Sequence, residues 1–589
     1  HILARLKDQD DKIRIGLLEM LSPHAGQEAI QVLGELVDPE KPDLMVAIIK
    51  AANRLAPELS SAFNQKVFET SHHSEVKAYT VIGLYRQAQN KYKGVIDSWL
   101  DSDDESERRA GAIAAGGSGD DSYIPRLNEM LEAERLGSVL PYIFKGLHSL
   151  GATDLNELVL PYLSHPLESV RLAALEAFEI DGDETLRKVI SLMGDSSGQV
   201  HRLAKNKIEA TTYQNGQLLV ESLSIPQRRV REGIFDLLES LNIKDLDFFR
   251  FARSQIESGY EYLAEAEGLR LFPEGPKRDL LINHFDQERQ VKMENILRVL
   301  AAQDRSGQMR IIWRGVFSAD DRQQAYGYEA LEDMMDVSLS KIMIPLLEDS
   351  SPSQSLAVGT RNFQLPDFDT DKAALYSHLL AKKDWVTVSL TLSMAEEQGL
   401  EKVDRETVLE LAQSENAYTS QMAQSLMDQL GGDPGKREDS MGKEITIPDK
   451  ILHLKGIEIF EALSVSELAA VASVTEEIVH PPGEIVIKEG DAGETMYLLI
   501  KGEVSVIKVQ GEDHEIELDR IGAGDYFGEM ALFEDVKRSA TIRTEQESRL
   551  LVLHKQEFKE IVREYPQIAL NICKVLSGRI RKLHKKVMT

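Results

Sequence analysis

The sequence predicts a multidomain protein in which an all-α solenoid is followed by a small β-roll with flanking helices. Two observations support this fold class. Residues that could begin helices recur every 30 to 32 residues over the N-terminal part, whereas residues 485–525 alternate short apolar segments with glycine-containing turns. A period near 30 residues is typical of a stacked two-helix unit. Short strands broken by glycine favour a small rolled or jelly-roll-like sheet.

The helical repeat is marked by hydrophobic-basic pairs such as Val76-Lys77, Val170-Arg171 and Val230-Arg231, each followed by helical sequence. Polar clusters precede the pairs, as helix caps would. Small residues such as Gly16 often follow three positions after a start, where one helix would need to approach its neighbour closely. The successive starts lie at residues 13, 44, 76, 107, 139, 170, 200 and 230. This period resembles that of HEAT repeats over about residues 1–350. A stack of this kind leaves a long concave face, so the resemblance implies a protein partner on that face.

An enzymatic role is the alternative for this region, because phycobilin lyases also use HEAT-like repeats. The acidic clusters recur where solvated turns are expected, and the sequence shows no catalytic arrangement of the kind a lyase would need. His72-His73 could suggest a metal, but adjacent histidines on a helix point to different sides. We therefore predict no catalytic residues, no metal site and no enzymatic activity.

The remaining chain divides by composition. Residues 351–430 are expected to form further helical repeats or a helical extension. Residues 431–447 are rich in glycine and charge, which indicates a flexible linker. Residues 448–589 then form the C-terminal domain, whose predicted strands are 485–487, 496–500, 504–509 and 516–518.

Helices are expected on both sides of the roll. Ser464 and Glu467 have the spacing of a capping box before an apolar helix. On the other side, the segment from Lys555 to about Lys586 has continuous helical periodicity. The single cysteine, Cys573, falls on an apolar face of that segment and is expected in the core. One cysteine also excludes an internal disulfide framework.

The motif that carries chemistry is the run at residues 527–533, Phe-Gly-Glu-Met-Ala-Leu-Phe, followed by Lys-Arg-Ser-Ala-Thr at residues 537–541. Gly528 would let the backbone approach a ligand, and the short helix after it would point N–H groups at a phosphate. Glu529 could accept a proton from a ribose 2′-hydroxyl, while Arg538 could hold phosphate oxygens through two parallel N–H bonds. The alternative is that Glu529 and Arg538 simply pair with each other or with solvent.

With this motif in place, residues 448–586 resemble a cyclic nucleotide-binding domain of the catabolite activator protein and protein kinase A regulatory subunit superfamily. The resemblance implies that Glu529 binds the ribose hydroxyl and Arg538 the phosphate. It also implies that Gly528, Met530, Ala531, Ser539 and Ala540 complete the cradle. Val506, Leu518 and Ile521 fall on strands that face the sugar and base in the family, although they could equally be plain core.

Two positions bear on the identity of the ligand. Kinase members usually have proline before the arginine, where this chain has Lys537. Ser539 resembles the activator type, which favours cyclic AMP over cyclic GMP, although a hydroxyl there can also assist guanine. No other cofactor is expected.

Composition limits the possible partners. The chain of 589 residues has a net charge of -30, which disfavours general nucleic-acid binding. It ends at Thr589 without sequence for a helix-turn-helix after the last helix. No stretch approaches the roughly 20 apolar residues that cross a bilayer. A cytoplasmic location follows as an expectation, with the oligomeric state left open.

Together these features predict a non-enzymatic regulatory or scaffold protein that senses a cyclic nucleotide and makes protein contacts through its solenoid. The combination also resembles the soluble tail of some bacterial nucleotide-translocase-like membrane proteins. Because the first residue is His1, a membrane domain could precede it, which would place the chain at the cytoplasmic face of a membrane as a regulator of transport. A scaffold with a vestigial nucleotide pocket is the remaining alternative.

Overall fold

The protein consists of two compact units, His1–Gln214 and Asn215–Thr589. They are described here from a computed structural model. The structure describes residues 2–6, 10–225, 227–241, 243, 246–348, 350–368, 372–398, 403–431, 445–461, 463–510, 514–534, 536–566, 568–570, 572–574, 577–578 and 581. The boundary between the two units, after Gln214, lies within the region predicted as a solenoid. Most of the predicted linker 431–447 lies outside the described residues.

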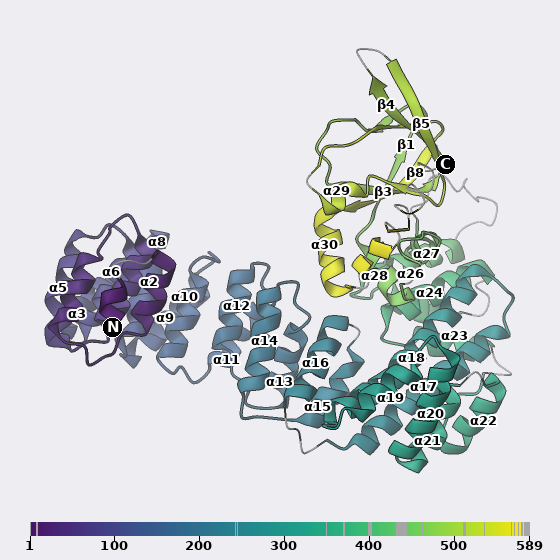
Figure 1. Ribbon diagram of the computed structural model, residues 1–589, viewed down its shortest axis with the longest axis horizontal. Coiled ribbons are helices and arrows are strands. Elements are labelled where there is room, and N and C mark those ends of the chain that lie inside the picture. The colour runs from purple at the N-terminus through teal and green to yellow at the C-terminus, as the bar shows by residue number, and fades with distance from the viewer. Residues whose placement is uncertain are drawn as a thin grey trace. The chain divides into compact units, whose positions relative to one another are not determined.

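The first unit is helical throughout its described part (Figure 1). Its elements are α1 (Ile2–Leu6), α2 (Asp11–Glu19), α3 (Gln27–Glu35), α4 (Pro42–Ala52), α5 (Pro57–Thr70), α6 (Ser74–Tyr85), α7 (Gln89–Leu100), α8 (Glu105–Ser118), η1 (Asp121–Tyr123), α9 (Ile124–Ala133), α10 (Leu140–Ser149), α11 (Leu155–Val159), η2 (Leu160–Ser164), α12 (Glu168–Ala177), α13 (Asp183–Leu192) and α14 (Gly198–Ala210). Every second helix contacts the next one of its kind, from α2 through α4, α6, α8, α10 and α12 to α14. The predicted starts coincide with the beginnings of these same helices.

The basic residue of the predicted pairs has a structural role in this unit. Arg171 donates from Nη1 to the carbonyls of His165 and Pro166, at 2.8 and 3.0 Å, and so closes the turn before its own helix. Arg108 does the same to Ser102 and Asp103, at 3.1 and 2.9 Å. Each arginine thus donates hydrogen bonds to turn carbonyl groups that have no hydrogen-bond partner within a helix.

Small residues bring helices together at a place the sequence pattern did not indicate. A Cβ on Gly116 of α8 would collide with the Cα atom of Gly146 on α10, so these two helices touch through their backbones. Gly16, at one of the expected close approaches, has open space where a Cβ would lie. The expectation for Gly16 is wrong because α2 is not crowded by a neighbour at that point.

The second unit begins with further helices. They are α15 (Gly216–Glu221), η3 (Ser222–Ser224), α16 (Arg228–Ser240), α17 (Phe248–Arg270), α18 (Pro276–Gln303), α19 (Gln308–Val316), α20 (Asp321–Met334), α21 (Val337–Met343), η4 (Ile344–Leu346), α22 (Pro352–Asn362), α23 (Lys372–Leu380), α24 (Trp385–Gln398), α25 (Arg405–Leu411), α26 (Ala417–Gly431), α27 (Ile447–Lys455) and α28 (Val465–Ser473). The 23 and 28 residues of α17 and α18 make these the longest helices of the described chain, and the two pack along each other.

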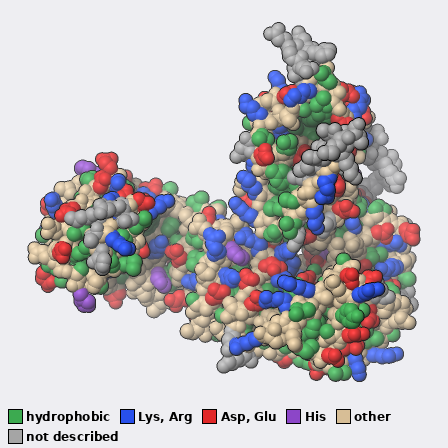
Figure 2. Space-filling view, viewed as in Figure 1, with side chains coloured by type: hydrophobic (Ala, Val, Ile, Leu, Met, Phe, Trp, Pro, Cys, Tyr) green, Lys and Arg blue, Asp and Glu red, His purple; other side chains and the backbone are tan. Residues whose placement is uncertain are grey.

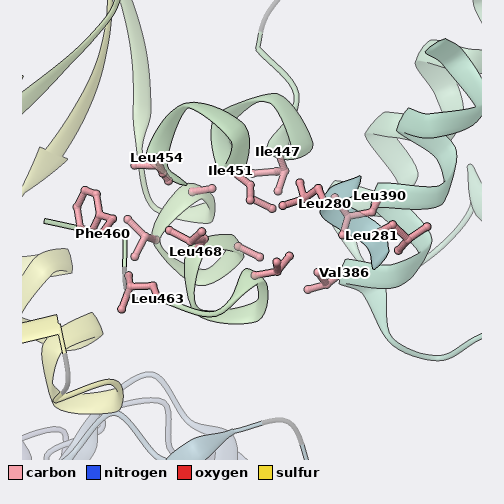
Figure 3. Close-up of a cluster of buried hydrophobic side chains, with 14 of the residues drawn as sticks. Leu280, Leu281, Val386, Leu390, Ile447, Ile451, Leu454, Phe460, Leu463 and Leu468 are labelled. Carbon is pink, nitrogen blue, oxygen red and sulfur yellow. The ribbon is translucent and has the colours of Figure 1, made fainter. Parts of the chain in front are cut away.

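One hydrophobic core joins this helical region to the helices that precede the β-roll (Figure 3). Leu280 and Leu281 of α18 and Leu390 of α24 face Ile447 and Ile451 of α27, and all five are buried. The same core continues through α28 into the strands of the roll. The roll therefore sits on the helical region through apolar contact, which explains why both belong to one unit.

The β-roll consists of two four-stranded antiparallel sheets, with strand orders β1-β8-β3-β6 and β2-β7-β4-β5. The elements are β1 (Glu476–His480), β2 (Ile485–Ile487), β3 (Thr495–Lys501), β4 (Glu503–Gln510), β5 (His514–Gly522), β6 (Tyr526–Phe527), α29 (Met530–Phe533), β7 (Thr541–Thr544), β8 (Ser548–His554) and α30 (Lys555–Glu564). Apolar side chains from both sheets fill the space between them, among them Leu499, Val504 and Leu550. The four predicted strands are confirmed.

The helices flanking the roll agree with the sequence on one side only. The predicted capping box at α28 is present, because Ser464 Oγ accepts from Glu467 N and the Glu467 carboxylate accepts from Ser464 N. The continuous helix expected from Lys555 is wrong, since α30 ends at Glu564, just before Tyr565-Pro566. Proline restricts the residue before it to extended backbone, which ends the helix there.

Cys573 is exposed, contrary to the sequence expectation. Its neighbour Ile572 is buried together with Ile568, four residues earlier. These two isoleucines form the apolar stripe of this segment, and Cys573 lies beside the stripe because successive helical residues are about 100° apart.

No helix of the described residues is both long enough and apolar enough to cross a bilayer. On the face seen in Figure 2, acidic, basic and apolar side chains are interspersed.

Candidate functional site

A cavity of about 260 Å³ opens in the β-roll beside the motif of residues 527–533. It is lined by nine of the ten residues predicted as ligand-binding, namely Val506, Ile521, Gly528, Glu529, Met530, Ala531, Arg538, Ser539 and Ala540. Ile487, Tyr526, Phe527, Val536, Lys537 and Ile542 complete the lining. The walls are therefore apolar strand residues on one side and the motif on the other.

The motif takes its shape from Gly528. This residue has φ +78°, in the left-handed region that favours glycine. A Cβ at this position would also lie 2.7 Å from Arg538 Nη1 and 3.2 Å from the Thr495 carbonyl oxygen. Glu529 follows as a half-buried residue at the start of the short helix α29, whose Met530 and Ala531 also border the cavity. The expected order of glycine, glutamate and short helix is present.

Arg538 is held by neutral oxygen atoms. Its Nη1 donates to the Gly528 carbonyl at 3.2 Å, and its Nη2 donates to the Thr495 carbonyl and to Thr495 Oγ1, both at 2.9 Å. Its backbone is fixed to the turn between β2 and β3, since Arg538 N donates to the Asp491 carbonyl at 2.8 Å and its own carbonyl accepts from Gly490 N at 2.9 Å. Both ends of the residue are thus positioned at the cavity wall.

The charge of Arg538 has no counter-charge in the described part of the chain. No ion pair joins it to a described carboxylate, so the structure shows no pairing between Glu529 and Arg538. Burial lowers the pKa of the Arg538 guanidinium below its usual value. A partly desolvated cation that faces a cavity favours an anion in that cavity.

Leu518 does not line the cavity and is 59% exposed. The register of β4 and β5 explains the difference: Val506 pairs with Asp519 and Ile507 pairs with Glu517, so Leu518 is the extra residue of a β-bulge. Alternation of side chains along a strand places residues correctly only up to such a bulge. The sequence carried no clear sign of it.

Sequence reasoning missed Thr495, which supplies two of the three acceptors that hold Arg538. It also missed the ring stack between Tyr497 and Phe527, whose centroids are 5.3 Å apart with planes 12° from parallel. Tyr497 and Phe527 are cross-strand partners on β3 and β6. Neither contact could be found without the strand pairing, although Phe527 belongs to the motif itself.

Residues 477–565 match the family model described as the cyclic nucleotide-binding domain. These residues contain both sheets, apart from the first residue of β1, together with the cavity and α30. The chain carries a cyclic nucleotide-binding domain.

Relatives of the domain include receptors and kinase subunits. The cyclic AMP receptor protein of Thermus thermophilus is 29% identical over 129 residues, which cover 22% of this chain and 60% of that protein. The cAMP-dependent protein kinase regulatory subunit of Pyricularia oryzae is 37% identical over 109 residues, which cover 18% of this chain and 27% of that protein. Among solved structures, the Thermus thermophilus catabolite activator protein matches with 27% identity and a TM-score of 0.21, over 22% of this chain and 61% of that one. The chain thus spans less than two thirds of each.

Among the described residues, no three Asp, Glu, His or Cys side chains gather where they could hold a metal ion. His72 and His73 lie in the turn between α5 and α6, and His73 Nε2 is 3.1 Å from the Pro39 carbonyl oxygen.

Proposed function

We propose that the protein is a regulatory protein that senses a cyclic nucleotide through the cavity of its β-roll. The observation that carries the proposal is the position of Arg538, a partly buried guanidinium at the cavity wall that donates only to neutral oxygen atoms of described residues. A cyclic phosphate would supply the missing negative charge. Glu529, in the first run of the motif, would accept a hydrogen bond from the ribose 2′-hydroxyl.

Cyclic AMP is the favoured ligand. Ser539 follows Arg538 and is exposed at the cavity, where its hydroxyl could reach the phosphate or the base. The two relatives described above are named for cyclic AMP. Cyclic GMP remains the second candidate, because a hydroxyl can also hydrogen-bond to guanine.

Calorimetric titration of the purified chain with cyclic AMP, cyclic GMP and AMP tests the proposal. We expect micromolar or tighter binding of cyclic AMP, weaker binding of cyclic GMP and none of AMP, which lacks the ring-closed phosphate. Glu529→Ala should weaken cyclic AMP binding by about tenfold or more, since a hydrogen bond to a charged group contributes about 1.5–3 kcal/mol.

The control for this titration is Glu515→Ala, which changes an exposed carboxylate of the same roll outside the cavity. Nucleotide that copurifies with the chain is first removed by unfolding and refolding. If the refolded chain then binds none of the three nucleotides, the pocket is vestigial and the sensor function is rejected.

Binding at the cavity could reach the helical region through α29 and α30. Phe533, at the end of α29, packs edge-on against Phe558 of α30, with ring centroids 5.6 Å apart. At the other end of α30, the Glu564 carboxylate accepts from Arg229 N at 3.2 Å, and Arg229 belongs to α16. A shift of α29 on ligand binding would thus be felt at α16 through one short helix.

We propose further that the helices of the first unit form a HEAT-like solenoid that binds a protein partner and has no enzymatic role. Support comes from the alternating contacts of α2 to α14 and from a hollow of about 570 Å³ between α4, α6, α8, α10 and α12. Tyr79 and Tyr142 border this hollow, and Lys50 Nζ lies 4.5 Å from the Tyr79 ring centroid. Tyrosine is enriched at protein interfaces. Cross-linking of the original chain and of Tyr142→Glu, each with and without cyclic AMP, tests this surface. We expect the substitution to abolish the cross-link to the protein partner.

A further inference from the structure

A second cavity, of about 330 Å³, lies inside the second unit between the helical region and the cyclic nucleotide-binding domain. Arg231 of α16 and Lys292 and Asn295 of α18 border it from the helical region. Glu467 of α28 and Tyr565, directly after α30, border it from the other side. It shares no lining residue with the nucleotide cavity.

Most charges around this second cavity are already paired. Arg298 makes two hydrogen bonds of 2.7 Å to the Glu232 carboxylate, and Arg228 lies 3.4 Å from Glu467. The Asp384 carboxylate accepts from Thr387 N and Thr387 Oγ1, at 2.9 and 2.6 Å. These groups need no further partner and form the frame of the cavity.

Two donors at the cavity have no such partner. Asn295 is 3% exposed, and its Nδ2 makes no hydrogen bond to the described residues. Lys292 is half-buried, and its ammonium makes no hydrogen bond or ion pair with a described residue. A buried donor without an acceptor is costly, and native structures rarely leave one without a protein, water or ligand partner.

Charges of both signs surround Lys292. Burial lowers the pKa of Lys292; Glu288 and Glu261 raise it, while the cations Arg231 and Lys382 lower it further. Burial raises the pKa of Glu294, and Arg298 lowers it. An anion bound beside Lys292 and Arg231 would accept from the Lys292 ammonium and the Asn295 amide.

We propose that this cavity binds a small anion, a carboxylate or a phosphate, through the Lys292 ammonium and the Asn295 amide. The volume equals that of about ten water molecules, so the cavity has room for an anion of a few heavy atoms together with some water. The site is independent of the proposed cyclic nucleotide function. A ligand in it would contact both the helical region and the residues that flank α30, and would hold the two together.

The test is calorimetric titration of the full chain with inorganic phosphate and, separately, with succinate. Hydrogen exchange of residues 287–298 serves as the local readout. Five forms of the chain are compared: the original chain, Lys292→Met, Asn295→Leu, Arg538→Ala and Lys188→Met. Lys188 is an exposed lysine on α13 and serves as the matched control for loss of one ammonium group. Arg538→Ala separates this cavity from the nucleotide cavity, where phosphate could also bind.

We expect one of the two anions to bind and to slow hydrogen exchange in residues 287–298. Affinity should fall at least tenfold in Lys292→Met and in Asn295→Leu, and remain within twofold in Arg538→Ala and Lys188→Met. Which anion binds tells a carboxylate ligand from a phosphate ligand. Asn295→Leu keeps the shape of the side chain, so it should fold even where Lys292→Met does not.

Three results would overturn the proposal. One is that neither anion binds to the original chain at ~10 mM, a concentration that would fill a weak site with a Kd of about 1 mM. Another is undiminished binding in both Lys292→Met and Asn295→Leu. The third is loss of binding in Arg538→Ala, which would assign the anion to the nucleotide cavity.

Discussion

Two partly buried arginines, Arg171 in the first unit and Arg538 in the roll, differ in the partner that the chain provides. Arg171 makes a bidentate contact with Asp195, at 2.7 and 2.8 Å, which raises the pKa of its guanidinium. Arg538 donates to carbonyl and hydroxyl oxygens, and burial lowers its pKa. Both residues also donate to backbone carbonyls, so the carboxylate is the decisive difference.

The contrast separates a structural arginine from one suited to binding. A folded chain gains stability when a buried guanidinium meets a carboxylate of its own, as at Arg171 and again between Arg108 and Glu134, 2.8 Å apart. A chain that must bind an anion has to leave that partner out and position the guanidinium with neutral acceptors. Substitutions at these arginines and at other buried polar groups test this difference.

Arg171→Ala should destabilise the first unit by about 3 kcal/mol, because the Asp195 carboxylate loses both guanidinium hydrogen bonds and keeps among its donors only neutral groups such as Ser197 N. Urea unfolding, followed by hydrogen exchange of residues 168–210, measures the loss. The control is Arg187→Ala, which removes an exposed arginine from α13 and should change stability by less than about 0.5 kcal/mol. Equal effects of the two substitutions would show that the pair between Arg171 and Asp195 contributes no more to stability than an exposed arginine does.

Arg538→Ala should weaken cyclic AMP binding by about 1.5–3 kcal/mol while the roll remains folded, because no described carboxylate loses a partner. Calorimetry measures affinity and thermal unfolding measures stability. Arg543→Ala is the matched control: Arg543 pairs with Glu515 at 2.7 Å on the same sheet, outside the cavity. Unchanged affinity in a folded Arg538→Ala would remove the phosphate role from this residue.

Asn295→Leu should raise the stability of the second unit by about 1 kcal/mol, since it removes a buried donor without an acceptor and keeps similar volume. If the Asn295 amide were instead paired within the fold, the substitution would lower the stability. Denaturant unfolding in anion-free buffer decides between them, with Asn362→Leu on the exposed end of α22 as control.

The Arg108–Glu134 pair should make stability depend on pH. Burial raises the pKa of Glu134, but hydrogen bonds from Arg108 and from two backbone N–H groups outweigh it and leave the pKa below the usual value. The contribution is therefore complete above the unfolded pKa of about 4.3 and is lost as pH falls through the folded pKa. Glu134→Gln should abolish this part of the acid dependence, which unfolding curves between pH 6 and pH 3 (roughly the range that spans the unfolded pKa) can measure.

Leu518→Ser should change cyclic AMP affinity by less than about 0.5 kcal/mol, because Leu518 lies on the bulge of β5, is exposed and does not line the cavity. Val506 lies on the paired strand β4 and lines the cavity, so Val506→Ser should weaken cyclic AMP binding more than Leu518→Ser does. A larger effect at Leu518 than at Val506 would show that the ligand reaches beyond the cavity.

Much of the candidate site was predictable because its residues are close in the sequence. Gly528 to Ala531 and Arg538 to Ala540 come from two short runs whose residue types already state the chemistry: a glycine for close approach, a carboxylate for a hydroxyl and a guanidinium for a phosphate. The period of the helices was likewise readable, since the starts fall at the beginnings of helices, where Arg108 and Arg171 donate to carbonyls of the preceding turn.

Local sequence specifies the individual elements: the alternating helices, the capping box at Ser464 and the order of glycine, glutamate and short helix in the motif. Tertiary structure alone decided which groups end up without a partner. The acceptors of Arg538 at Thr495, the bulge at Leu518 and the unpaired Asn295 depend on strand register and on helices far apart in the chain. Local patterns set backbone conformation, whereas the pairing or isolation of a buried charge is fixed only when distant segments meet.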